Sequence, residues 1–103
     1  MSNLYQEIVS LLEGGGKGVV ATVISSQGSA PQRSQAKMLI REDGTSCGTV
    51  GGGRVEHKVR EKAVEVLESG ESQLVHFDLS GKDPAGSICG GQMDVFLEAV
   101  LPD

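Results

Sequence analysis

DGTSCGTVGGGRVE, residues Asp43 to Glu56, combines three structural signals in one short stretch. Asp43-Gly44 is a strong hairpin signal, and its flanks predict paired strands over Ala36 to Arg41 and Thr45 to Val50. Four glycines then fall within residues 48–53, directly before a segment with helical periodicity. Because a glycine run is costly in conformational entropy, this one indicates either positive φ angles or the close approach of another group to the main chain.

The segments on either side of this stretch predict two helices and three more strands. One apolar face over Asn3 to Glu13, with Asn3 and Gln6 placed as a capping box, predicts the first helix. The second begins near Val55 and is expected to stop at Gly70. The other strands are predicted at Gly18 to Ser25, Gln73 to Leu79 and Gln92 to Val100. The order α-β-β-β-α-β-β predicts an α+β fold, with a mixed β-sheet of about five strands and two helices.

Length and composition favour one small domain over residues 1–103. Apolar residues make up 38% of the chain and aromatic residues only 3%, so the core is expected to consist of Val, Leu, Ile, Ala and Met. Such a lean core favours an apolar surface that another chain covers, and we therefore expect a homodimer.

Several functional classes are disfavoured by charge and by the arrangement of apolar residues. A net charge of -5 argues against sequence-independent binding of nucleic acid, which needs a basic surface. No signal-peptide pattern and no apolar run near the roughly 20 residues of a membrane span is present, so we expect no membrane association and a cytoplasmic protein. Two cysteines do not make a disulfide framework, and free thiols are expected at Cys47 and Cys89.

The glycine run before the second helix has two interpretations. A helix N-terminus carries unpaired N–H groups and a partial positive charge, so Gly51, Gly52 and Gly53 form a candidate anion cradle to which Arg54 adds a charge. Alternatively, the run is a tight turn packed against the sheet. The spacing approaches a phosphate-binding P-loop, but Arg54 and Val55 replace its lysine and hydroxyl residue, which argues against a nucleoside triphosphatase.

Two further loops have a similar composition. Residues 26–37 are polar and carry Ser29 and the cations Arg33 and Lys37, and residues 83–92 place Cys89 before the pair Gly90 and Gly91. Separately, they fit a solvated loop and a packed cysteine at a turn. Together with the glycine run, they predict convergence at one edge of the sheet on a phosphorylated, sulfur-bearing or metal-bearing ligand.

The remaining polar residues do not indicate catalysis. His57 is expected on the exposed face of the second helix and His76 within a strand, where surface or satisfied histidines are more common than ligands. Glu56 fits the favourable first turn of a helix, and Glu98 fits cross-strand pairing. Since no Ser/His/Asp or Cys/His arrangement is present, the sequence favours a non-catalytic binding module.

Three ordered motifs resemble the N-terminal domain of the XdhC/CoxI family, accessory proteins of xanthine dehydrogenase, carbon monoxide dehydrogenase and other molybdenum hydroxylases. The motifs are ATVISSQGSAPQRSQAKML at 21–39, DGTSCGTVGGGRVE at 43–56 and CGGQMDVFLE at 89–98. The resemblance implies a chaperone that binds the molybdenum cofactor (molybdopterin), a phosphorylated pterin dithiolene, and helps deliver its sulfurated form. It implies a molybdenum hydroxylase apoenzyme and a cofactor sulfurase as partners. The candidate cofactor-binding residues are Ser29, Arg33, Lys37, Gly51, Gly52, Gly53, Arg54, Cys89, Gly90 and Gly91.

The chain departs from the family pattern in three places. Many members carry a cysteine where Arg54 stands, some have Pro-Gly where this chain has Ser34-Gln35, and full-length members usually continue into a Rossmann-like domain that is not expected here. Two alternatives therefore stay open. One is a sulfur-transfer protein that uses Cys89, and the other is a protein that docks onto a larger one without cofactor.

Overall fold

The computed structural model describes residues 3–27, 36–50, 53–78 and 92–102 of the chain. In chain order, the elements are α1 (Leu4–Glu13), β1 (Gly18–Gln27), β2 (Lys37–Arg41), β3 (Ser46–Gly48), α2 (Gly53–Ser69), β4 (Gln73–Asp78) and β5 (Gln92–Val100). This order confirms the predicted α+β class, with five strands and two helices. The third strand is shorter than predicted because the chain turns at Gly48, whose φ is 86°.

Helix α1 begins at the predicted capping box. The Gln6 amide donates to Asn3 Oδ1 at 2.8 Å, and the Asn3 amide donates to Gln6 Oε1 at 3.4 Å. The helix ends at Gly14, whose amide donates to the Ser10 carbonyl at 3.1 Å. None of its residues is fully buried, so the helix is held against the sheet partly by polar contacts.

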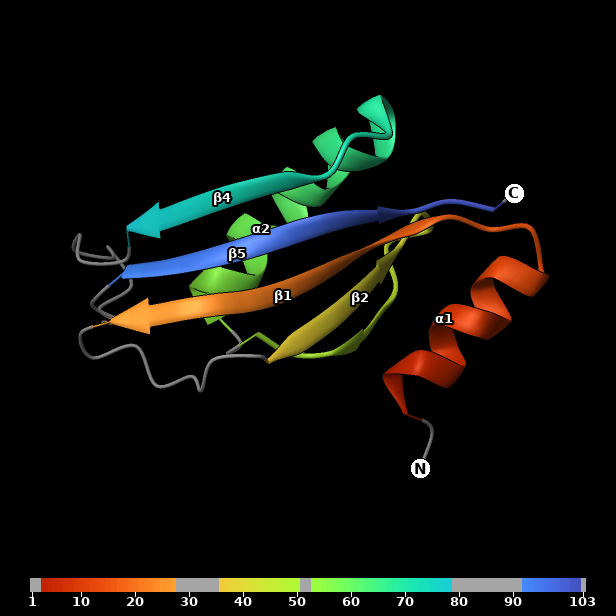
Figure 1. Ribbon diagram of the computed structural model, residues 1–103, viewed down its shortest axis with the longest axis horizontal. Coiled ribbons are helices and arrows are strands. Elements are labelled where there is room, and N and C mark those ends of the chain that lie inside the picture. Colours follow the sequence, from red (N-terminus) through yellow and green to blue (C-terminus); the bar gives the residue numbers. More distant parts are fainter. Residues whose placement is uncertain (1–2, 28–35, 51–52, 79–91, 103) are drawn as a thin grey trace.

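The five strands form one sheet in the order β3-β2-β1-β5-β4, with β3 and β4 at its edges (Figure 1). Every pair of neighbouring strands is antiparallel, so the prediction of a mixed sheet was wrong. The reason lies in the crossover. Helix α2 carries the chain from β3 at one edge to β4 at the other, and the strands that it joins are therefore not neighbours.

Helix α2 covers one face of the sheet, and the core lies between them (Figure 1). Gly70, with a φ of 74°, follows its last residue as predicted. The core contains the expected Val, Leu, Ile, Ala and Met side chains, and Phe77 in addition. From the helix come Val55, Val59, Ala63 and Val66, and from the strands Val19, Ala21, Val23, Met38, Ile40, Phe77, Met93, Val95 and Leu97.

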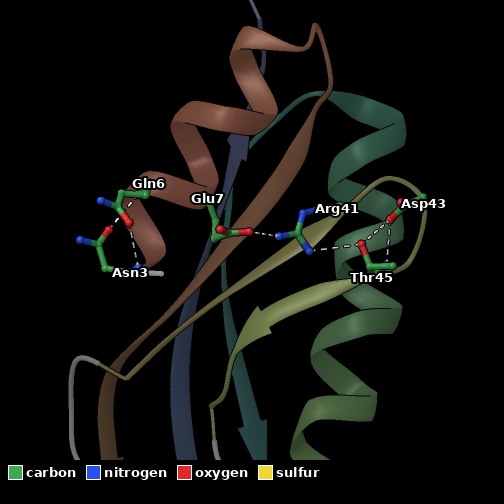
Figure 2. A network of polar contacts seen from close by, with 6 residues as sticks. All are labelled: Asn3, Gln6, Glu7, Arg41, Asp43 and Thr45. Atoms are coloured by element: carbon green, nitrogen blue, oxygen red, sulfur yellow. Dashed lines mark hydrogen bonds and ion pairs between the residues drawn. The ribbon is translucent and has the colours of Figure 1, made fainter. Parts of the chain in front are cut away.

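The opposite face of the sheet is covered only in part. Helix α1 packs against β2 and β3, where an ion pair joins Glu7 to Arg41 (Figure 2). Toward β4, one row of paired residues crosses this face, from Lys37 through Thr22 and Phe96 to Leu74. No helix in the described part of the chain is long and apolar enough to span a membrane.

Candidate functional site

The described residues that flank the two long candidate loops lie at one end of the sheet. Strand β1 ends at Gln27, which stands opposite Gln92 at the start of β5. Gln92 in turn stands opposite Asp78, the last residue of β4. The three residues therefore lie side by side on adjacent strands, at the end where β1 and β4 leave the sheet in Figure 1.

The start of α2 is at the same end of the sheet. Gly48 closes β3 opposite Met38, and β2 begins one residue earlier, at Lys37. The Val23 amide donates to the Ala36 carbonyl at 2.8 Å, which fixes the position of the residues before β2. The flanks of all three candidate loops thus lie toward the same end of the sheet, although Lys37 stands opposite Thr22, five residues before the end of β1. The convergence of the loops themselves stays a prediction.

Two glycines of the GTVGGG run have different surroundings. At Gly48 an added Cβ would lie 2.5 Å from the Lys37 carbonyl oxygen, so this glycine permits the close packing of β3 on β2. At Gly53, which has a φ of 56°, an added Cβ would meet no heavy atom of the described residues within 4 Å. Val50 between them is fully buried. Gly48 therefore fits the interpretation as a packed turn, whereas Gly53 has free space beside it among the described residues, and the anion cradle stays a prediction.

A side-chain contact orders the approach to α2. The Thr49 hydroxyl donates to Glu56 Oε2, and Glu56 lies in the first turn of the helix. The sequence explained Glu56 by the helix dipole alone. The structure adds a partner that holds its carboxylate beside the residues preceding the helix.

Lys37 has a partner that the sequence did not reveal. Its ammonium group lies 3.1 Å from the Tyr5 hydroxyl and 5.3 Å from the centre of the Tyr5 ring. Because side chains alternate along a strand, Lys37 lies on the α1 face of β2, whereas Met38 and Ile40 face α2. The apolar spacing of α1 marked a helix face, but no local signal pairs two residues that are 32 positions apart.

The structure describes only part of the candidate set. Gly53 begins α2, Arg54 is its second residue, and Lys37 begins β2. Ser29, Arg33, Gly51, Gly52, Cys89, Gly90 and Gly91 lie outside the described residues. Their grouping around a ligand stays a prediction.

The histidines and Cys47 show no ligand cluster in the described residues. His57 is exposed, with Nε2 at 3.4 Å from Glu61, and His76 Nδ1 lies 2.7 Å from Asp94, in agreement with the surface roles expected of them. Cys47 is a half-exposed free thiol on β3. Among these residues, no group of three or more His, Cys, Asp or Glu side chains gathers closely enough to hold a metal ion.

A sequence model of the XdhC and CoxI family matches residues 11–78, which include β1, the hairpin, the glycine run and α2. The chain belongs to the XdhC and CoxI family. The predicted family is thereby confirmed, and the match includes the motifs at 21–39 and 43–56 but not the one at 89–98. The matched region also contains Gly53.

The chain is similar in sequence to three proteins that have different names. It is 40% identical over 97 residues to "Uncharacterized protein YqeB" of Escherichia coli K12, covering 92% of this chain and 18% of that protein. It is 29% identical over 107 residues to a probable xanthine dehydrogenase component of Bacillus subtilis 168, covering 100% of this chain and 32% of that protein. It is 38% identical over 63 residues to "Molybdenum cofactor insertion chaperone PaoD" of E. coli K12, covering 60% of this chain and 20% of that protein.

A solved structure has the same fold. The crystal structure of a xanthine dehydrogenase from Bacillus halodurans aligns with a TM-score of 0.79 and 34% identity, covering 92% of this chain and 30% of that one. The chain thus spans between 18% and 32% of the length of the relatives that it matches.

Proposed function

We propose that this domain binds the molybdenum cofactor and assists its insertion into a molybdenum hydroxylase such as xanthine dehydrogenase. Membership of the XdhC and CoxI family and a relative named as a molybdenum cofactor insertion chaperone support this function. The structural observation that carries the proposal is the free space beside Gly53 among the described residues, at the start of a 17-residue helix and toward the sheet end where β1 and β4 end.

The residues at this end fit the chemistry of the proposed ligand. The cofactor carries a phosphate, and a helix N-terminus offers unpaired N–H groups with a partial positive charge. Gly53 has no side chain that could block this terminus, and Arg54 follows it directly in the sequence. We propose that Gly51, Gly52, Gly53 and Arg54 hold the phosphate. Ser29, Arg33, Lys37, Cys89, Gly90 and Gly91 would contact the rest of the cofactor from the other two loops.

The role proposed for the domain is binding and protection. The cofactor supplies redox chemistry once it is installed in the hydroxylase, whereas the residues of this chain hold the ligand and keep water from it. The proposed partners are a molybdenum hydroxylase apoenzyme, a cofactor sulfurase and a second copy of this chain, in the cytoplasm.

A titration of the purified chain with molybdenum cofactor under anaerobic conditions tests the proposal. We expect saturable binding, and we expect Arg54→Ala to weaken it about tenfold or more, because a charge-assisted contact contributes roughly 1.5 to 3 kcal/mol. Lys17→Ala, which removes a cation at the opposite end of β1, serves as the matched control and should bind as tightly as the wild type. Absence of binding at micromolar cofactor would contradict the proposal, provided that the thermal melts are normal.

Lys37→Ala asks a separate question in the same titration. If Lys37 contacts the cofactor, its loss weakens binding as the loss of Arg54 does. An unchanged affinity would show that Lys37 contacts Tyr5 on the α1 face and not the cofactor.

The other candidate functions predict different results. If Cys89 transfers sulfur, its thiol should be accessible and should be alkylated rapidly in the folded protein. A docking protein should bind its partner equally well with or without cofactor.

A further inference from the structure

Strand β4 is an edge strand that no other described element covers along its outer side. Within the described residues, it pairs only with β5 and has no strand on its other side. Its sequence, QLVHFD, contains neither proline nor lysine, the residues that commonly block an edge. The other edge strand, β3, is only three residues long and is covered on one face by α1. An exposed edge of this kind can pair with a strand of another chain.

An apolar side chain accompanies this edge. Leu74 is 66% exposed and lies on the sheet face opposite α2, next to Phe96 on the neighbouring strand. On the face toward α2, Phe77 is buried and Val75 is half-buried against the core. A strand added at β4 would therefore cover apolar surface on both faces of the sheet.

The flank of α2 that faces β4 carries charges of both signs. Lys58, Glu61, Lys62 and Glu65 line a hollow together with Phe77, and Lys62 lies 3.2 Å from Glu65. The opposite flank of the helix faces β3, since Arg60 donates to the Gly44 carbonyl at 2.9 Å and to Ser46 Oγ at 2.6 Å. These four charges cancel, whereas the whole chain has a net charge of -5, so this flank of α2 adds no net charge of its own to the edge.

We propose that β4 pairs antiparallel with β4 of a second copy, so that the two sheets become one continuous sheet across a two-fold axis. This inference deepens the homodimer that belongs to the proposed function, by naming its surface. A two-fold axis makes the two α2 helices antiparallel to one another. The residues Lys58, Glu61, Lys62 and Glu65 of one copy then lie opposite Glu65, Lys62, Glu61 and Lys58 of the other. Lysines of one copy then face glutamates of the other across the paired strands, which makes the edge complementary to itself.

The association of the 103-residue chain, measured without cofactor by sedimentation equilibrium, tests this surface. We expect a dimer, and we expect Leu74→Asp to raise its dissociation constant about tenfold or more by placing a charge in apolar surface. Val9→Asp is the matched control, because Val9 is 52% exposed on α1 and also changes from an apolar side chain to a charged one. Thermal melts of both variants verify folding.

A charge exchange on α2 tests the symmetry of the pairing. The variants Glu61→Lys/Glu65→Lys and Lys58→Glu/Lys62→Glu should each dimerise several-fold more weakly than the wild type, because like charges face one another. An equimolar mixture should recover a heterodimer. Glu13→Lys/Glu42→Lys adds the same positive charge at exposed sites away from β4 and should not affect the wild-type dimer.

Three results would overturn this surface: a monomer over the whole concentration range, a dimer that Leu74→Asp does not weaken, or no recovery in the mixture. If the chain is a monomer and binds a different protein through β4, then that protein, and not a second copy, is the partner of this edge. Because no cofactor is present in these measurements, a failure of cofactor binding leaves them unaffected.

Discussion

The ammonium group of Lys37 lies 3.1 Å from the hydroxyl of Tyr5 and 5.3 Å from the centre of its ring, which links the start of β2 to the first turn of α1. At an exposed site, a cation over an aromatic ring contributes about 0.5–1 kcal/mol. We expect Lys37→Met and Tyr5→Leu each to lower the free energy of unfolding by about that amount. The double variant should lose less than the sum, because the two changes remove one shared contact. Urea denaturation of the four proteins measures this coupling, and strict additivity would show that it is absent.

The ion pair between Glu7 and Arg41 is the second polar link between α1 and the sheet (Figure 2). Its atoms are 2.6 Å apart, and both side chains are mostly shielded, with 28% and 22% exposure. Glu7→Gln should lower the free energy of unfolding by about 1 kcal/mol, because shielding makes this pair stronger than a fully exposed one. Amides of α1 should exchange with solvent faster in this variant. Glu13→Gln on the same helix is exposed and should leave both measurements unchanged.

Gly48 and Gly44 have similar backbone conformations but different neighbours. Their φ angles are 86° and 93°, so alanine is strained at both positions. Of these two, only Gly48 would bring the added Cβ close to a backbone oxygen, at 2.5 Å, whereas at Gly44 it meets no atom of the described residues within 4 Å. We expect Gly44→Ala to cost about 1 kcal/mol and Gly48→Ala at least about twice as much. Equal thermal shifts for the two variants would mean that the Lys37 carbonyl moves aside without cost.

Local sequence signals predicted most of the elements. The capping box of Asn3 and Gln6, the Asp43-Gly44 turn and the stop at Gly70 each depend on residues close together in the chain, and each is present in the structure. The pairing of strands is not local. Nothing in the sequence around β5 indicates that it inserts between β1 and β4, and this insertion makes every neighbouring pair antiparallel.

The candidate site was predictable to the same extent. The glycine run could be recognised as either packing or open, but only the structure separates Gly48 from Gly53, because the difference depends on which atoms lie beside each. The contacts of Lys37 with Tyr5 and of Arg41 with Glu7 join residues more than 30 positions apart, beyond the range of helix or strand periodicity.

The hairpin turn predicts a pH dependence of stability. Thr45 donates its hydroxyl to Asp43 Oδ1 at 2.6 Å and its amide at 2.9 Å, and the hydroxyl also accepts from Arg41 Nη1 at 3.2 Å (Figure 2). The hydrogen bond from the Thr45 hydroxyl, and after it the one from the Thr45 amide, lowers the pKa of Asp43 below its ordinary value. Because the pKa is lower in the folded chain, the ionised carboxylate stabilises the hairpin at pH values above the unfolded pKa of about 3.9. This contribution is lost as the pH falls through the lower pKa of the folded state.

Asp43→Asn tests this dependence, because asparagine keeps the shape and one acceptor oxygen but carries no charge. We expect the variant to be less stable than the wild type at neutral pH, by a difference that stays constant down to about pH 5 and shrinks below about pH 4. Urea denaturation over this pH range measures the difference. In a Thr45→Val background, the hydroxyl donor is absent, so Asp43→Asn should have a smaller effect at every pH. A difference that persists unchanged well below the unfolded pKa would show that the ionised carboxylate of Asp43 does not stabilise the hairpin.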